Sequence, residues 1–206
     1  MCDFPNVENN DVELDALIAF CDDWSRRIAS LNELYGKGYA DESLILCCCY
    51  VEAIAKLFYG LELDGEESFI KALLRFGENE VFGRINPRLL LERLAKMKGE
   101  RGDLTTKLSL AFAGFQDRFY PSEEIMEACK PVLSNEELFS LENCLWMGTV
   151  AGLAHKITKC EGVHNGMIQV RSRAETVLDF RLLYPALIRI FEKARRRVLS
   201  GKLRTY

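Results

Sequence analysis

Lys159 and His164, with four residues between them, are the side chains of this chain best suited to acid–base chemistry at a phosphate. A neutral imidazole at His164 can take the proton from a ribose 2′-hydroxyl. An ammonium group at Lys159 can offset the negative charge that develops on an attacked phosphate. If the two converge, they hold the minimum equipment for binding or cutting a phosphodiester. The plain structural alternatives are a surface lysine near a helix end and a loop histidine beside the Asn165–Gly166 turn.

Glu52 is the third candidate, because it lies in a segment that is mostly apolar. The polar positions of this segment share one narrow helical face and are Glu42, Cys49, Glu52 and Lys56. Glu52 can orient Lys159 or His164 if its helix packs against the segment that carries them. The alternative is an ordinary Glu52–Lys56 ion pair at four-residue spacing, worth about 0.2–0.5 kcal/mol.

Three other chemistries fit the residues of this segment less well. His155, Cys160 and His164 can all ligate zinc, but no second cluster of zinc-binding spacing supplies a fourth ligand. Cys160 and His164 lack an orienting third group and an oxyanion site for thiol catalysis. The glycines lack the strand-to-helix context of a phosphate-binding loop. We therefore expect neither a metal nor a cofactor.

Length and composition predict one globular domain over residues 1–206, since nearly half of the residues are hydrophobic. The net charge of −4 argues against a protein that coats nucleic acid by bulk charge. The charge is nevertheless uneven, because all seven charged residues from Asp3 to Asp23 are acidic and six residues from Lys193 to Arg204 are basic. This asymmetry either recognises a partner or, at the basic end, complements the dipole of a last helix.

Cysteine usage and hydropathy predict a cytoplasmic protein with reduced thiols. There are eight cysteines, but the chain is long for a disulfide scaffold and no leader is recognised at its start. Cys47, Cys48 and Cys49 point three ways around a helix, which favours core packing over chelation. The longest apolar run, 144–154, is too short for the roughly 20 residues of a membrane helix, so we expect no membrane span.

Apolar residues at three- and four-residue intervals predict an all-α bundle of six or seven helices. The helix over 41–59 is apolar almost all round, so it belongs at the centre of the bundle. Capping signals and apolar periods indicate further helices over about 11–35, 64–77, 87–97, 105–119 and, uninterrupted from a Ser134–Glu137 capping box, 134–157, with a short restarted piece over 122–131. Residues 167–180 predict a small hairpin or a loop before a last helix that opens at Tyr184–Pro185. Gly148 and Gly152 predict a close helix approach.

Two segments resemble small bacterial proteins of the HEPN-like superfamily. The segment Asp41–Gly60 is similar to their second helix, in which an acidic residue sits inside an apolar helix that ends in Tyr-Gly. The segment Lys159–Gly166 is similar to their Arg-Cys, short spacer and Val-His, with Lys159 in the place of the arginine. Lysine supplies a point charge where arginine offers a planar fork for phosphate.

The resemblance implies a HEPN-like bundle that interacts with RNA or nucleotides and cleaves RNA without metal, in a toxin or defence system. On that reading Lys159, His164 and Glu52 are the catalytic residues, and RNA, an antitoxin and a second copy in a homodimer are the expected partners. The alternative is a catalytically inactive helical domain that binds a partner protein, with Lys159 recording the loss of activity.

Overall fold

The structure is a computed structural model that describes the backbone of residues 8–59, 65–96, 102–157, 163–164, 167–169 and 176–200. Within these residues the chain is an all-α helical bundle with one small sheet. The α-helices are α1 (Glu8–Gly36), α2 (Ala40–Tyr59), α3 (Gly65–Phe76), α4 (Pro87–Lys96), α5 (Gly102–Ala111), α6 (Ser122–Cys129), α7 (Asn135–Glu142), α8 (Val150–Ile157) and α9 (Phe180–Leu199). The shorter elements are the 3-10 helices η1 (Glu80–Gly83) and η2 (Leu145–Gly148) and the strands β1 (Val163–His164), β2 (Met167–Gln169) and β3 (Thr176–Asp179).

Helix α2 lies at the centre of the larger hydrophobic core, as its apolar circumference predicted. It packs against α1, α3, α8 and α9. The α2 side chains in this core are fully buried and are Leu44, Cys47, Cys48, Val51, Ile54 and Ala55. Burial raises the pKa of the Cys47 and Cys48 thiols well above the ordinary value, so both act as small apolar residues.

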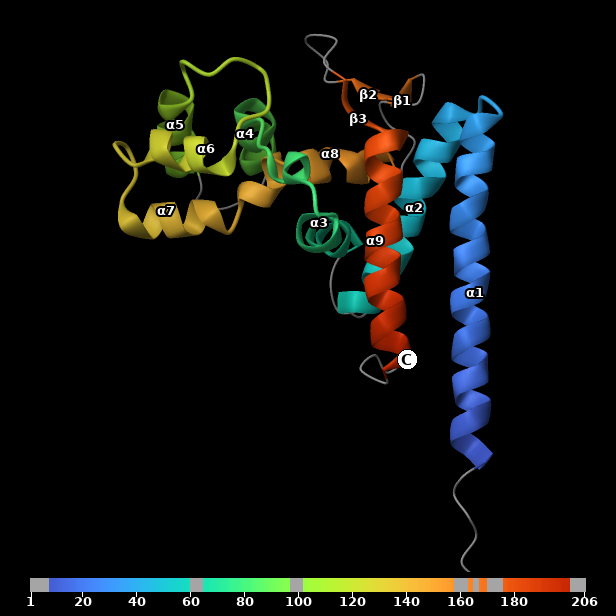
Figure 1. Ribbon diagram of the computed structural model, residues 1–206. Coiled ribbons are helices and arrows are strands. Elements are labelled where there is room, and N and C mark those ends of the chain that lie inside the picture. Colours follow the sequence, from blue (N-terminus) through green and yellow to red (C-terminus); the bar gives the residue numbers. More distant parts are fainter. Residues whose placement is uncertain are drawn as a thin grey trace, which may run out of the picture.

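A second, smaller hydrophobic core lies among α4, α5, α6 and α7. Leu90, Leu108, Ile125 and Leu141 are fully buried within it. Figure 1 shows these four helices as a group beside the larger bundle, with α8 running between the two groups. The two cores therefore belong to different sets of helices.

Backbone hydrogen bonds join the two groups of helices at one seam. The bonds run from Ile85 N to Tyr120 O (2.8 Å), Tyr120 N to Ile85 O (2.9 Å), Asn86 N to Gly148 O (2.9 Å) and Val150 N to Arg84 O (3.0 Å). Because buried backbone groups are costly to leave unpaired, this seam fixes where α4 and α8 begin relative to each other.

Local sequence signals account for several helix ends. Gly38 has a φ of +93°, a conformation that glycine adopts at little cost just after α1. The Ser134 hydroxyl accepts from Glu137 N while the Glu137 carboxylate accepts from Ser134 N, which is the expected capping box. The Asp179 side chain accepts from Leu182 N and so caps α9.

Three predicted boundaries were wrong, and there are nine α-helices among the described residues instead of six or seven. The helix expected over 105–119 ends at Ala111, since the chain then turns to bring Tyr120 to the seam. The last helix begins at Phe180 because Asp179 caps it there, which leaves Pro185 inside α9.

The pattern from 134 to 157 is also divided, into α7, η2 and α8. The break has a specific cause. The Gly148 carbonyl accepts from Asn86 N across the seam, and the Thr149 hydroxyl accepts from Gly152 N, which caps a new helix.

The expected close approach at the two glycines is confirmed despite this break. A Cβ atom at Gly148 would lie 2.8 Å from Leu90 Cβ and 2.9 Å from Ile85 Cγ2. A Cβ at Gly152 would lie 2.8 Å from Arg93 Nη1. The missing side chains thus let α4 pack closely against η2 and the start of α8.

The expected hairpin before the last helix is present as a three-stranded antiparallel sheet. Its order is β1-β2-β3, with His164 opposite Met167 and Ile168 opposite Leu178. None of the helices in the described part of the chain is long and apolar enough to cross a membrane.

Candidate functional site

Glu52 lies on the half-buried side of α2 and contacts two other ionisable groups. Its Oε1 atom is 3.2 Å from Nζ of Lys56, which is the ion pair expected within α2. Its Oε2 atom is 3.7 Å from Nε2 of His155 on α8. Glu52 Oε1 also occupies the space that a Cβ at Gly65 would need, only 2.6 Å away. Glycine at the first position of α3 therefore leaves room for this carboxylate.

His155 reaches Glu52 from the buried side of α8. The residue is only 8% exposed, and its ring meets the Phe69 ring edge to face at a centroid distance of 5.4 Å. Packing against an aromatic ring and contact with a carboxylate restrict the orientation of the imidazole. His155 is thus placed to position Glu52 and is poorly placed to reach a large substrate.

A second ion pair, between Arg93 and Glu66, joins α4 to α3. Arg93 of α4 is 14% exposed, its Nη1 atom is 3.1 Å from Oε1 of Glu66, and its Nη2 atom donates to the Gly152 carbonyl at 2.8 Å. The Nη1 contact is close enough for an ion pair but is not aligned as a hydrogen bond. Burial lowers the pKa of Arg93 and the Glu66 carboxylate opposes this shift, so the guanidinium stays charged at neutral pH.

Glu52 with its two partners and the Arg93–Glu66 pair form one polar cluster, made of Glu52, Lys56, Glu66, Arg93 and His155. Glu66 follows Gly65 at the start of α3, and Gly152 and His155 lie one turn apart on α8. The cluster therefore gathers side chains of α2, α3, α4 and α8 where the two groups of helices meet.

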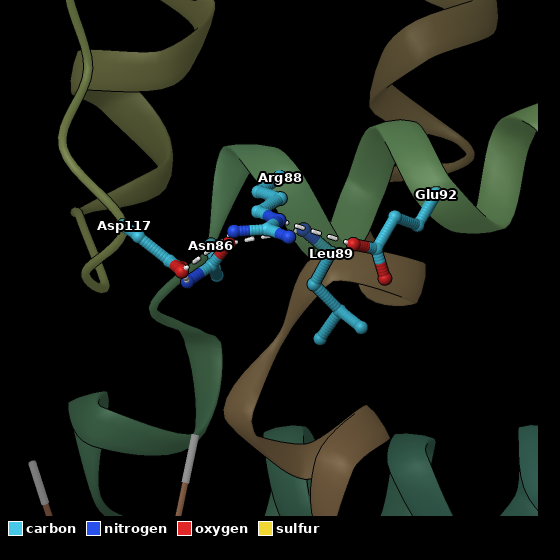
Figure 2. Close-up of polar contacts among 5 residues, drawn as sticks. All are labelled: Asn86, Arg88, Leu89, Glu92 and Asp117. Carbon is cyan, nitrogen blue, oxygen red and sulfur yellow. Dashed lines mark hydrogen bonds and ion pairs between the residues drawn. The ribbon is translucent and has the colours of Figure 1, made fainter. Parts of the chain in front are cut away.

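A separate polar network fixes the start of α4, as Figure 2 shows. Asn86 is 1% exposed; its Oδ1 accepts from Leu89 N at 3.0 Å and its Nδ2 donates to Oδ1 of Asp117 at 2.8 Å. Arg88 bridges Oδ2 of Asp117 and Oε1 of Glu92, at 3.4 and 3.1 Å. Because Asn86 caps α4 and ties it to Asp117, the network holds Arg93 in position two turns later. Its role is structural.

Of the three predicted catalytic side chains, the structure describes only that of Glu52. Lys159 lies outside the described residues. His164 is described as part of β1, where its backbone pairs with Met167, but its side chain lies outside the description. Cys160, considered above as a zinc ligand or nucleophile, is likewise outside it, and no group of three or more metal-binding side chains gathers in the described ranges.

The placement of α8 and β1 nevertheless bears on these residues. His155 contacts Glu52 and lies four residues before Lys159, while β1, which contains His164, lies beside α2. Both described ends of the segment that carries Lys159 are therefore held against the helix that carries Glu52.

Sequence reasoning overlooked Arg93 and treated His155 only as a zinc ligand. The signal for Arg93 was its place between Leu90 and Leu94, which are both buried on one face of α4. A cation on an apolar face predicts a buried ion pair, although its partner could not be chosen from the sequence.

Comparisons with known proteins returned no family model, no curated protein and no solved structure that matches this chain.

Proposed function

We propose that this protein is HEPN-like, interacts with RNA, and cleaves it without a metal ion. The observation that supports the proposal is the contact of Glu52 with α8, four residues before Lys159, together with the position of β1 beside α2. A six-residue step connects Ile157 to Val163, so the segment that carries Lys159 begins and ends near α2. The central position of α2 in an all-α bundle also fits the resemblance.

In this proposal His164 is the general base and Lys159 is the electrostatic stabiliser. The imidazole removes the proton of a ribose 2′-hydroxyl, and the 2′-oxygen forms a bond to the adjacent phosphorus. The bond from phosphorus to the 5′-oxygen breaks, and the proton passes to that oxygen. Lys159 offsets the added charge on the phosphoryl oxygens. Glu52 orients either Lys159 or His164, and Lys56 and His155 hold Glu52 in place.

The test compares the two histidines of the chain in a cleavage assay on single-stranded RNA with chelator present. His164→Ala should abolish cleavage and leave the fold intact. Lys159→Arg should preserve or raise the rate, because arginine restores bidentate phosphate contact. His155→Gln should lower the rate without abolishing cleavage, since His155 is buried and acts only by holding Glu52.

Two results would contradict the catalytic assignment. The first is that wild-type protein, freed of contaminating ribonuclease, does not cleave RNA, which would mean that the protein is not a ribonuclease. The second is that His164→Ala still cleaves RNA while His155→Gln does not, which would mean that His155 on α8 is the general base.

The second candidate function is a helical domain that binds a partner protein, and the N-terminal half of α1 favours it. Leu14, Ile18 and Phe20 are 43%, 38% and 40% exposed on this helix. Figure 1 shows that this half of α1 extends beyond the end of α9. The charged residues up to Asp23 are all acidic, so the expected partner, an antitoxin or a second copy in a homodimer, presents a basic surface with apolar side chains.

Light scattering of the purified chain, alone and after Leu14→Asp with Ile18→Asp, tests this candidate. The substituted protein should lose any self-association that the wild-type protein shows. A wild-type protein that is monomeric and remains so when mixed with the product of a neighbouring gene would argue against it.

A further inference from the structure

Four basic side chains gather at the end of α3, three of them around the Phe76 ring, although the chain as a whole is acidic. Cζ of Arg75 and Nζ of Lys193 each lie 5.4 Å from the ring centroid, and Cζ of Arg197 lies 5.7 Å from it. Arg189 joins them by donating to the Gly77 carbonyl at 2.9 Å. We call Arg75, Arg189, Lys193 and Arg197 the basic patch.

Part of this patch has a structural role. Lys193 donates to Oε1 of Glu78 at 2.6 Å, and Nε of Arg189 lies 3.9 Å from the other Glu78 oxygen. These contacts hold Glu78 at a φ of +52°, a conformation that is rare for glutamate. Glu78 thus pairs with two of the four cations, Arg189 and Lys193. Like charges held together repel, so their clustering costs folding free energy that a bound polyanion would return.

Asp22 of α1 pairs with a different side of α9. Nη2 of Arg195 lies 3.5 Å from Oδ1 of Asp22, across the contact between α1 and α9. Residues 193 and 197 are two positions away from Arg195, and two residues correspond to about 200° around a helix. The pairing with α1 therefore leaves the basic patch on the other side of α9.

The patch has the form of a line. Arg189, Lys193 and Arg197 follow one another at four-residue spacing on α9, which places three cations on one face over about 12 Å. A line of cations suits a chain of phosphates better than a single small anion, and guanidinium groups can bind phosphate oxygens in pairs.

We infer that the basic patch binds the phosphodiester backbone of single-stranded RNA. This inference rests on the proposed function, and it adds where the RNA is held. The patch lies at the end of α3, about 16 Å along the helix from Gly65, which adjoins Glu52 in the polar cluster. A strand held at both ends of α3 covers several nucleotides, so the patch contributes to substrate binding and leaves the chemical step to other residues.

The experiment measures binding of a fluorescent single-stranded RNA by anisotropy over a series of salt concentrations, with chelator present. Lys193→Glu combined with Arg197→Glu should weaken binding at least about tenfold at low salt. Each phosphate contact on a single strand contributes about 0.7 to the slope of log affinity against log salt, so losing two should reduce the slope by about 1.4. In the cleavage assay the same variant should raise KM and leave kcat nearly unchanged.

The matched control is Arg26→Glu with Arg27→Glu on α1, which makes the same change of net charge at two exposed arginines paired with Asp23. It should bind RNA within about twofold of wild type. Thermal unfolding checks the fold of each variant. Arg75→Glu provides a second test at an exposed residue of α3 if the α9 variant fails to fold.

The outcomes separate this inference from the proposed function. If wild-type protein binds or cleaves RNA and the patch variants do so equally well, or if patch and control variants lose the same affinity, the patch assignment is wrong and the RNA function stands. If wild-type protein neither binds nor cleaves RNA, both are wrong. If poly-L-glutamate displaces RNA at equal charge concentration, the patch is a docking surface for an acidic protein and the RNA assignment fails.

Discussion

Glu52, Glu66 and Arg93 carry charge into the boundary between the two groups of helices. Glu66 and Arg93 pair with each other, and Glu52 pairs with Lys56 and contacts the His155 imidazole. Removing one partner of such a pair leaves an uncompensated, partly buried charge, which costs more than the pair contributes. These residues therefore constrain how α2, α3, α4 and α8 meet, whether or not the neighbouring segment is catalytic.

Glu137 of α7 is a carboxylate whose hydrogen bonds change its pKa. A hydrogen bond from Lys107 and one from Ser134 N stabilise its carboxylate, and they lower its pKa from 4.5 to about 2. Because the pKa is lower in the folded state than in the unfolded chain, the carboxylate stabilises the fold above about pH 4.5. That contribution is lost as the pH falls toward about 2.

We predict that Glu137→Gln makes the stability of the protein less dependent on pH in this range. The variant should be less stable than wild type at pH 7, and the difference should shrink as the pH falls from about 4.5, because protonation removes the same interaction from the wild type. Urea unfolding at pH 7, 4 and 3 measures this. The neighbouring substitution Glu136→Gln serves as the control, and an equal effect there would show that general charge is responsible.

At the level of elements, the seam between α4 and the start of α8 depends on glycine. A side chain at Gly148 would meet Leu90 Cβ and Ile85 Cγ2 at less than van der Waals distance, and neither atom is the flexible end of a long side chain. The same seam ends η2 and begins α8, so packing and helix boundaries are coupled there.

We predict that Gly148→Leu destabilises the protein by roughly 1–3 kcal/mol through overpacking. Chemical denaturation of the variant gives the free energy of unfolding. Gly114→Leu is a matched control, because a Cβ at Gly114 has no other atom within 4 Å. An unfolding midpoint for Gly148→Leu equal to that of the control would mean that η2 does not pack against α4 as described.

At the scale of the whole molecule, the two hydrophobic cores can unfold together or separately. The core among α4, α5, α6 and α7 is smaller than the one around α2 and α9 and is joined to it mainly through the seam. Small groups of helices with few contacts to the rest commonly open at lower free energy than the global unfolding reaction.

We predict that Leu108→Ala loosens the α4–α7 group and leaves α2 and α9 protected. Leu108 is fully buried in the smaller core, so the substitution should cost about 2–5 kcal/mol through lost burial and a cavity. Hydrogen exchange measured by mass spectrometry should show faster exchange in α4–α7 alone. Equal acceleration in α2 and α9 would show that residues 1–206 unfold as one unit, as expected from length.

The sequence by itself determined those features that depend on neighbouring residues. The apolar circumference of α2 predicted its burial, the Ser134–Glu137 spacing predicted a capping box, and the four-residue spacing of Glu52 and Lys56 gave their ion pair as the alternative to a catalytic role. Only the tertiary structure decided the contact of Glu52 with His155, the ion pair of Arg93 with Glu66, and the division of 134–157 at Thr149. These depend on hydrogen bonds and packing between residues far apart in the chain, and a period of 3.6 residues carries no information about which distant partner will be met.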